Sequence, residues 1–92
     1  MLVMDDLSHR ATIDGKDIAL TAAEWKILAY LGSNPGLVVS RERILGECLD
    51  YAAEGSERTV DTHVKNIRIK IGAPDLVETV RGFGYRFTGE KR

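Results

Sequence analysis

Residues 58–71 read RTVDTHVKNIRIKI, and this pattern predicts a helix with one apolar and one polar face. At about 100° per residue, one narrow stripe along the helix holds four apolar side chains, which are Val60, Val64, Ile67 and Ile71. We expect this stripe to face a core. The opposite face holds cationic, hydroxyl and amide side chains, namely Arg58, Thr59, Thr62, Lys65 and Asn66. One acid, Asp61, lies at the edge of that face.

The polar face of this helix offers the groups that a DNA major groove requires. A helix fits the width of the groove, Asn can bind an adenine edge through two hydrogen bonds, and Lys or Arg can reach the phosphates on either wall. Ile69, in the middle of the polar face, would meet a thymine methyl group or a sugar there. For this helix taken alone, a charged face that is merely solvated remains the alternative.

A glycine-rich turn near the C-terminus favours DNA binding. The segments VETVR and YRF predict two short strands, and Gly-Phe-Gly at 82–84 joins them into a hairpin over residues 77–87. Arg81 stands directly before the turn, so its guanidinium should project at the tip, where it would enter a minor groove. The turn is not a nucleotide-binding loop, because the GxGxxG spacing and the following helix are missing.

The first half of the chain predicts a small sheet and a helix. Short apolar runs on either side of the Asp-Gly pair at 14–15 favour antiparallel strands within the first twenty residues. Thr21 and Glu24 have the spacing of a capping box, which predicts the start of a helix, and Asn-Pro-Gly at 34–36 stops it.

A second helix precedes the one at 58–71. An extended segment at 37–39 leads to Ser40, which caps a helix that ends near Asp50, and a loop at 50–57 follows. The predicted fold class is therefore α+β: a winged helix-turn-helix with an N-terminal small antiparallel sheet, three helices and a C-terminal β-hairpin wing. We expect residues 1–92 to form one such domain.

The composition fits one small globular domain. With 92 residues, 43% hydrophobic and 29% charged, the chain can bury a single core. Cys48 is the one cysteine, which excludes an internal disulfide and suits a reducing compartment. No run approaches the roughly eighteen apolar residues of a membrane span, and the start MLVMDD lacks a signal-peptide pattern. We expect a soluble, cytoplasmic protein that makes no membrane contact.

The net charge of −1 conceals an uneven distribution. Residues 1–57 hold five Lys or Arg against ten Asp or Glu, whereas residues 58–92 hold eight against four. This split favours a polyanionic partner for the C-terminal face. A winged helix that binds another protein instead of DNA is the main alternative, because a negative net charge is unusual for a stand-alone DNA-binding domain. Against it, the polar face of the helix at 58–71 offers a protein partner only Ile69.

Neither catalysis nor a metal site is indicated. His9 and His63 are separated by the core helices, Cys48 lies on an apolar helix face, and no carboxylate cluster recurs at ligand spacing. We therefore expect no catalytic residue, no metal and no cofactor. The start LVMDD resembles part of a receiver domain with Asp50 as phosphoacceptor, but Asp50 ends a helical pattern and 92 residues cannot hold both domains.

Four motifs, in order, resemble the OmpR/PhoB-type winged-helix effector domain of bacterial two-component response regulators. They are TxxEWxILxxL from Thr21, SRExIL from Ser40, RTVDTHVKNIRIKI from Arg58 and TVRGFGYRF from Thr79. The resemblance covers roughly residues 2–88. It implies sequence-specific binding to double-stranded DNA for transcription regulation, with the helix at 58–71 in the major groove and the wing at 77–87 at the minor groove.

The resemblance also implies a set of DNA-binding residues, which are Arg58, Thr62, His63, Lys65, Asn66, Arg68, Thr79, Arg81 and Tyr85. In this set, Lys65 and Asn66 would face the groove. Arg58, His63 and Arg68 would hold phosphates. Thr79 and Tyr85 would contact the DNA backbone, and Arg81 would reach into the minor groove. Asp61 looks instead like an intradomain partner of a basic side chain.

The partners implied by the resemblance lie partly outside this chain. They are RNA polymerase at loop 50–57, an N-terminal receiver domain with its sensor kinase, and a second copy on repeated half-sites of a promoter, the isolated domain being monomeric. The loop at 50–57 is acidic and lacks the tryptophan often found there. Asn66 and Ile69 stand where basic residues are usual, so we expect this chain to have its own base preference.

Overall fold

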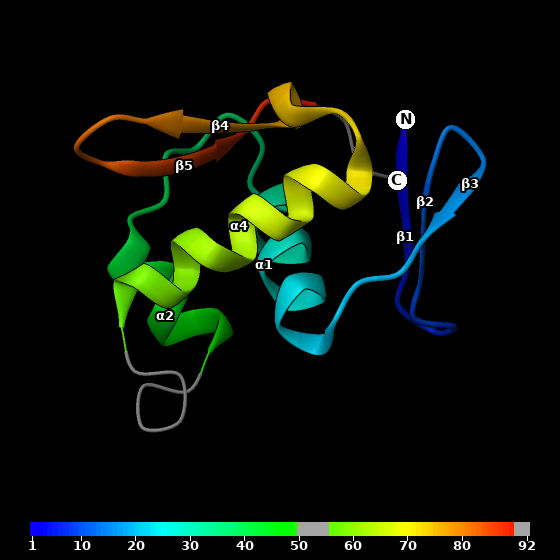
Figure 1. Ribbon diagram of the computed structural model, residues 1–92, viewed down its shortest axis with the longest axis horizontal. Helices are drawn as coiled ribbons and strands as arrows, with labels where there is room; N and C mark the ends of the chain where they lie inside the picture. The colour runs from blue at the N-terminus through cyan, green and yellow to red at the C-terminus, as the bar shows by residue number, and fades with distance from the viewer. Residues whose placement is uncertain (50–55, 90–92) are drawn as a thin grey trace.

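The computed structural model describes residues 1–49 and 56–89, and its elements follow one another in the predicted order (Figure 1). β1 (Leu2–Asp5), β2 (Arg10–Ile13) and β3 (Lys16–Ile18) form an antiparallel sheet in the order β1-β2-β3. Asp14 and Gly15 have positive φ angles of +49° and +84°, which is the backbone of a two-residue hairpin turn. The predicted N-terminal sheet is thereby confirmed.

Side-chain caps begin the first two helices. Before α1 (Ala22–Gly32), Thr21 Oγ1 accepts a hydrogen bond from the Glu24 N–H at 3.2 Å, and Glu24 Oε1 accepts one from the Thr21 N–H at 2.9 Å. This is the predicted capping box. Before α2 (Arg41–Cys48), Ser40 Oγ accepts a hydrogen bond from the Arg43 N–H at 3.1 Å, which confirms the second predicted cap.

α4 (Glu57–Ile71) has the predicted apolar stripe, because its four members, Val60, Val64, Ile67 and Ile71, are only 0–4% exposed. The helix ends at Gly72, which has a φ of +65° and donates its N–H to the Arg68 carbonyl at 3.2 Å. The loop predicted at 50–57 was one residue too long, since Glu57 already belongs to the helix. Residues 50–55 of that loop lie outside the described residues.

The C-terminal hairpin forms the predicted wing. It consists of β4 (Val77–Val80) and β5 (Gly84–Phe87), and a short 3₁₀ turn that the sequence did not predict, η1 (Pro74–Leu76), precedes it. Val39, between α1 and α2, pairs with Tyr85 through two backbone hydrogen bonds of 2.8 and 2.9 Å. The wing is therefore fixed by its backbone to the segment before α2.

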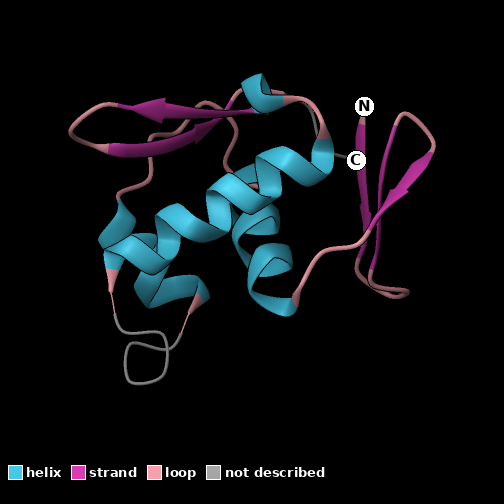
Figure 2. Ribbon diagram, viewed as in Figure 1, coloured by secondary structure: helices cyan, strands magenta, loops and turns pink. Residues whose placement is uncertain are grey.

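The helices and the wing share one core. α4 crosses in front of α1, the wing runs along the upper edge, and the N-terminal sheet lies at the opposite end from the wing tip (Figure 1, Figure 2). Buried side chains from the sheet, from helices α1, α2 and α4 and from the wing join in this core, among them Leu2, Leu28, Ile44, Val64 and Phe87. The predicted fold class, an α+β winged helix-turn-helix, is confirmed. Its arrangement leaves the polar face of α4 pointing outward.

Candidate nucleic-acid interface

Four exposed side chains form a row along the outer face of α4, which we call the outer row: Arg58, Thr62, Lys65 and Ile69. Their spacings of four, three and four residues place them on one side of the helix, opposite the buried stripe. Ile69 is 69% exposed and therefore packs on no core. Asn66 lies half-buried beside the row.

The cations of the outer row are not neutralised. Within residues 1–49 and 56–89, the side chains of Arg58 and Lys65 form neither an ion pair nor a hydrogen bond. Thr62 donates its hydroxyl to the Arg58 carbonyl at 3.2 Å, which holds that side chain against the helix. A rigid helix that carries two unpaired cations can neutralise phosphates without first breaking an internal pair.

The wing tip presents a third unpaired cation. The turn is closed by the Phe83 N–H, which donates to the Val80 carbonyl at 2.9 Å, and Gly82 has a φ of +81°. Arg81 is exposed at this turn and pairs with no acid in the described part of the chain. Phe83 beside it is 72% exposed. The structure therefore places Arg81 at the exposed tip of the wing, as the sequence predicted.

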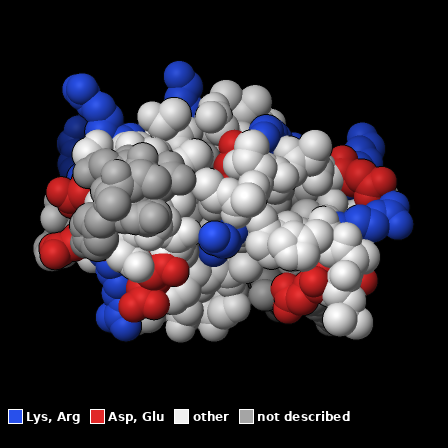
Figure 3. Space-filling model, turned by 90° about the horizontal axis from the view of Figure 1, so that it is seen from below, with Lys and Arg blue, Asp and Glu red and all other residues white. Residues whose placement is uncertain are grey.

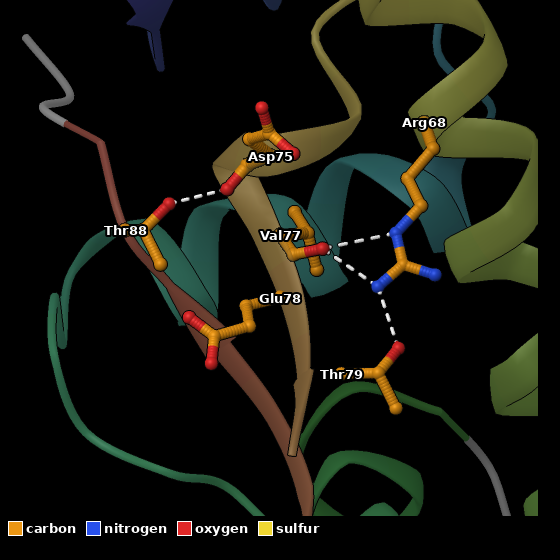
Figure 4. A pocket seen from close by; sticks show the side chains of 6 residues that line it. All are labelled: Arg68, Asp75, Val77, Glu78, Thr79 and Thr88. Atoms are coloured by element: carbon orange, nitrogen blue, oxygen red, sulfur yellow. Dashed lines mark hydrogen bonds between the residues drawn. The ribbon is translucent and has the colours of Figure 1, made fainter. Parts of the chain in front are cut away.

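Arg68 turns toward the wing, as Figure 4 shows. Its Nε and Nη2 donate to the Val77 carbonyl at 2.9 and 2.6 Å, and Nη2 also donates to Thr79 Oγ1 at 2.7 Å. For phosphate binding, these contacts leave Arg68 its other terminal nitrogen and Thr79 its hydroxyl proton. The neighbouring pocket is not suited to a phosphate, because Asp75 and Glu78 also line it.

Asp61 joins α4 to α2 and to the wing. Its Oδ1 accepts hydrogen bonds from Arg41 Nε at 2.7 Å and from the Tyr85 hydroxyl at 2.6 Å. The guanidinium carbons of Arg41 and Arg68 lie 5.9 and 5.6 Å from the centre of the Tyr85 ring, within cation–π range. We call these four residues the Asp61 cluster. The prediction that Asp61 is an intradomain partner of a basic side chain is confirmed.

Two members of the Asp61 cluster, Tyr85 and Arg41, have a raised pKa. Burial, and then the hydrogen bond to Asp61, raise the pKa of Tyr85. The hydrogen bond to Asp61 raises the pKa of Arg41 as well. Tyr85 therefore keeps its proton at neutral pH and donates a hydrogen bond to Asp61. For the predicted DNA-backbone contact, Tyr85 would have to break this bond, because a phosphate oxygen accepts hydrogen bonds and cannot donate one.

Two other polar residues of α4 point away from the outer row. His63 Nε2 is buried and makes no hydrogen bond to the described residues, so the predicted phosphate contact through this atom requires the ring to turn outward. Lys70 Nζ lies 2.5 Å from Oε1 of the buried Glu24 and ties α4 to the capping box of α1. Burial alone would raise the pKa of Glu24, but the bonds from Lys70 and the Thr21 backbone outweigh it and lower that pKa.

Other kinds of site, such as a metal centre or a reactive thiol, find little support among the described residues. No group of three or more His, Cys, Asp or Glu there is placed to hold a metal ion. His9 stacks on Trp25, with ring centres 4.6 Å apart. Burial raises the pKa of Cys48 to about 11, which keeps its thiol protonated and unreactive. Over residues 1–49 and 56–89, no helix combines the length and apolarity needed to cross a membrane.

Residues 15–87, which include α1, α2, α4 and the wing, match the protein family described as "Transcriptional regulatory protein, C terminal". The chain belongs to this family. It is 40% identical over 91 residues to the transcriptional regulatory protein SrrA of Staphylococcus aureus, a match that covers 94% of this chain and 38% of SrrA. The chain therefore spans less than half the length of that relative.

Solved structures place this member of the family among response regulators. The DNA-binding domain of the response regulator AdeR, crystallised in complex with an intercistronic region, superposes with a TM-score of 0.86 at 31% identity, over 96% of this chain and 93% of that one. The response regulator DrrB, a Thermotoga maritima OmpR/PhoB homologue, gives a TM-score of 0.82 at 37% identity, over 94% and 41% of the two chains. The OmpR/PhoB-type resemblance is confirmed.

Sequence reasoning missed several contacts of this regulatory domain. It assigned no role to Arg41, and it did not pair Arg68 with the wing or Lys70 with Glu24. A partial signal was present for Arg68, because Asp61 and Arg68 are seven residues apart and so share one flank of the helix. The residues that bind this flank of the helix could not be predicted from the pattern, because they belong to other elements.

Proposed function

We propose that this domain binds double-stranded DNA in a sequence-specific manner to regulate transcription, with α4 in the major groove and the β4–β5 wing at the minor groove. The observation that carries the proposal is the joint presentation of unpaired cations. Arg58 and Lys65 on α4 and Arg81 on the wing are exposed, and Arg68 and Asp61 tie that wing to that helix. Cations on two adjoining elements suit the phosphates on the two sides of a groove.

Within this interface we assign different tasks to the residues. Thr62, Lys65 and Asn66 face the groove. Asn66 is the base-reading residue, because its amide can bind an adenine edge, and Lys65 reaches a phosphate on the groove wall. Arg58 holds a phosphate, and Arg81 enters the minor groove. Arg68 and Thr79 remain proposed DNA contacts through the groups that their hydrogen bonds within the domain leave free. His63 is proposed to reach a phosphate by turning its ring outward. Tyr85 keeps its bond to Asp61, so we propose no phosphate contact through its hydroxyl.

The chain is proposed to act as the C-terminal part of a longer response regulator. The 38% coverage of SrrA supports this placement. A receiver domain and its sensor kinase would then supply the control, and two copies would bind repeated half-sites of a promoter. We also propose that loop 50–57 contacts RNA polymerase. Residues 50–55 of this loop lie outside the described residues. A promoter target places the protein in the bacterial cytoplasm.

A selection from random DNA duplexes at two salt concentrations tests the proposal. We expect enrichment of a repeated motif, with weaker recovery at the higher salt because phosphate contacts release counterions. The exposed apolar residues Phe83, Leu37 and Val38 favour a protein partner as the second candidate. No enrichment at either salt concentration contradicts DNA recognition and favours that candidate.

A further inference from the structure

The wing is attached to α4 by side chains at two separate points. Asp61 accepts a hydrogen bond from the Tyr85 hydroxyl on β5, and Arg68 donates hydrogen bonds to Val77 and Thr79 on β4. Asp61 and Arg68 are seven residues apart, about 10 Å along the helix. Thr79 and Tyr85 are directly opposite each other in the hairpin. Two attachment points, one on each strand, define the angle of the wing relative to α4. With a single point, the wing could rotate about it.

Asp61 also connects this attachment to α2. The same Oδ1 that accepts from Tyr85 accepts from Arg41, the first residue of α2. The guanidinium groups of Arg41 and Arg68 both lie within cation–π range of the Tyr85 ring. One carboxylate therefore holds three elements together at the point where α2, α4 and the wing meet.

The same elements have other attachments that keep them folded. The apolar stripe of α4 packs on the core independently of Asp61. The backbone of β5 is hydrogen-bonded to Val39, and Phe87 is fully buried. Loss of the Asp61 bonds should therefore change the angle of the wing more than the stability of the fold.

An acid in this place has a cost for a protein that binds DNA. The Asp61 side chain is 42% exposed and lies on the helix that presents Lys65 and Arg58. A carboxylate there repels phosphates, so it weakens binding to every sequence unless it brings a compensating gain.

We propose that Asp61 is a positioning residue that sets the angle of the wing relative to α4, so that Arg81 reaches the minor groove while α4 occupies the major groove. This inference rests on the proposed function for its DNA part. Removing the carboxylate has two opposed effects: it relieves the repulsion of phosphates, and it lowers the contribution of Arg81. The affinity of the single variant mixes the two effects, but a double-mutant cycle separates them.

The test compares the loss caused by Arg81→Ala in two backgrounds, using the duplex enriched by the selection. In the wild-type background we expect Arg81→Ala to weaken binding. In the Asp61→Asn background we expect the same substitution to weaken binding less. The factor of weakening should be reduced by about threefold or more, because the wing no longer holds residue 81 in place. Equal losses in the two backgrounds would overturn the proposal.

Glu78→Gln provides a matched control. Glu78 is an acid on the wing itself, its side chain is 44% exposed, and it forms an ion pair of 2.7 Å with Arg86. This pair does not involve α4. We expect Arg81→Ala to cost the same factor with Glu78→Gln as in the wild type. A reduction equal to that seen with Asp61→Asn would assign the effect to lost charge and contradict a positioning role.

Tyr85→Phe covers the case in which Asp61→Asn fails to fold. It removes only the hydroxyl that donates to Asp61 and leaves the ring within cation–π range of Arg41 and Arg68. We expect this variant to show the same coupling with Arg81→Ala, and additive losses would overturn the proposal.

A measurement without DNA keeps this inference separate from the proposed function. Residual dipolar couplings of the amides of β4, β5 and α4 in the free domain report the angle between wing and helix. We expect Asp61→Asn to change the wing couplings relative to those of α4, with Glu78→Gln unchanged. If the wild type bound no DNA but these couplings shifted, the proposed function would fail while the positioning of the wing stood. Unshifted wing couplings would contradict the positioning role itself.

Discussion

Gly84 is the residue at which one added methyl group has the largest expected effect on the wing. It has a φ of +152°, and a Cβ built on it would lie 2.0 Å from the carbonyl oxygen of Val39. That oxygen belongs to the backbone bridge with Tyr85 and cannot move away cheaply. Gly82, two residues earlier, has a φ of +81° but nothing within 4 Å of such a Cβ.

The two glycines therefore form a matched pair for a stability test. Gly82→Ala should cost about 1–2 kcal/mol of unfolding free energy through its backbone angle alone. Gly84→Ala should cost about 1–3 kcal/mol beyond that, because the methyl group also overlaps the Val39 backbone. Urea denaturation of both variants measures the difference. Equal costs would mean that the wing shifts away from the 36–39 segment without loss.

Asn66 and Lys65 are adjacent residues with different expected effects on DNA. Asn66→Ala should lose about 1–3 kcal/mol of discrimination at one base pair, because an amide that reads a base edge is removed. Lys65→Ala should weaken binding to all sequences alike, because a phosphate does not carry sequence information. Binding to a panel of single-base variants of the selected site distinguishes the two. An unchanged base preference for Asn66→Ala would refute its reading role.

At the scale of elements, the pair of Glu24 and Lys70 links the start of α1 to the end of α4. Folding lowers the pKa of Glu24 below its ordinary value of 4.5. Its carboxylate therefore contributes stability that is fully present above about pH 4.5 and is lost as the pH falls through the lower folded value.

Glu24→Gln should make the domain less stable at neutral pH by about 1–2 kcal/mol, since the partly exposed Lys70 loses its charged partner. The variant keeps the capping box, because Gln also serves at that position. Thermal unfolding followed from pH 7 to pH 3 should show a smaller decline for this variant than for the wild type. Glu47→Gln, at an exposed position on α2, is the control and should keep the wild-type decline. Parallel pH profiles for wild type and Glu24→Gln would contradict the link.

Elements were predictable from the sequence where their signals are local. The capping box at Thr21 and Glu24 depends on residues three apart, and the apolar stripe of α4 follows from its own spacing. Contacts between elements were not predictable in this way. The Val39–Tyr85 bridge joins residues 46 positions apart, and the turn of Arg68 toward Val77 depends on where the wing packs. The candidate site was therefore predicted by its residues, while its internal bonds emerged only from the tertiary arrangement.

At the scale of the whole molecule, the uneven charge distribution suits the single DNA-binding face that we propose. The underside, seen in Figure 3, carries acidic and basic side chains interspersed, so the described residues form no continuous cationic surface there. The outer row of α4 and the wing tip present three exposed cations that form no ion pair within the described residues: Arg58, Lys65 and Arg81. The negative net charge is thus compatible with DNA binding, because most of the acids lie in residues 1–57.

The salt dependence of binding measures how many phosphates the domain neutralises. With about four to six phosphate contacts, the logarithm of the binding constant should fall with the logarithm of salt concentration with a slope of about −4 to −5. Arg58→Ala and Arg81→Ala should each reduce the slope by about 1. Fluorescence anisotropy titrations at several salt concentrations give these slopes. A slope near zero would contradict the electrostatic part of the proposed function.

The turn at residues 81–83 projects from a wing whose base is held by Gly84, Tyr85 and Phe87. Because the contacts that attach the wing to the rest of the domain lie at its base, the exposed side chains of the turn can be replaced without loss of those contacts. For the proposed DNA contact, we expect substitutions at Arg81 and Phe83 to change the preferred DNA without disturbing the packed interior. A library randomised at these two positions should therefore yield folded proteins with diverse preferences.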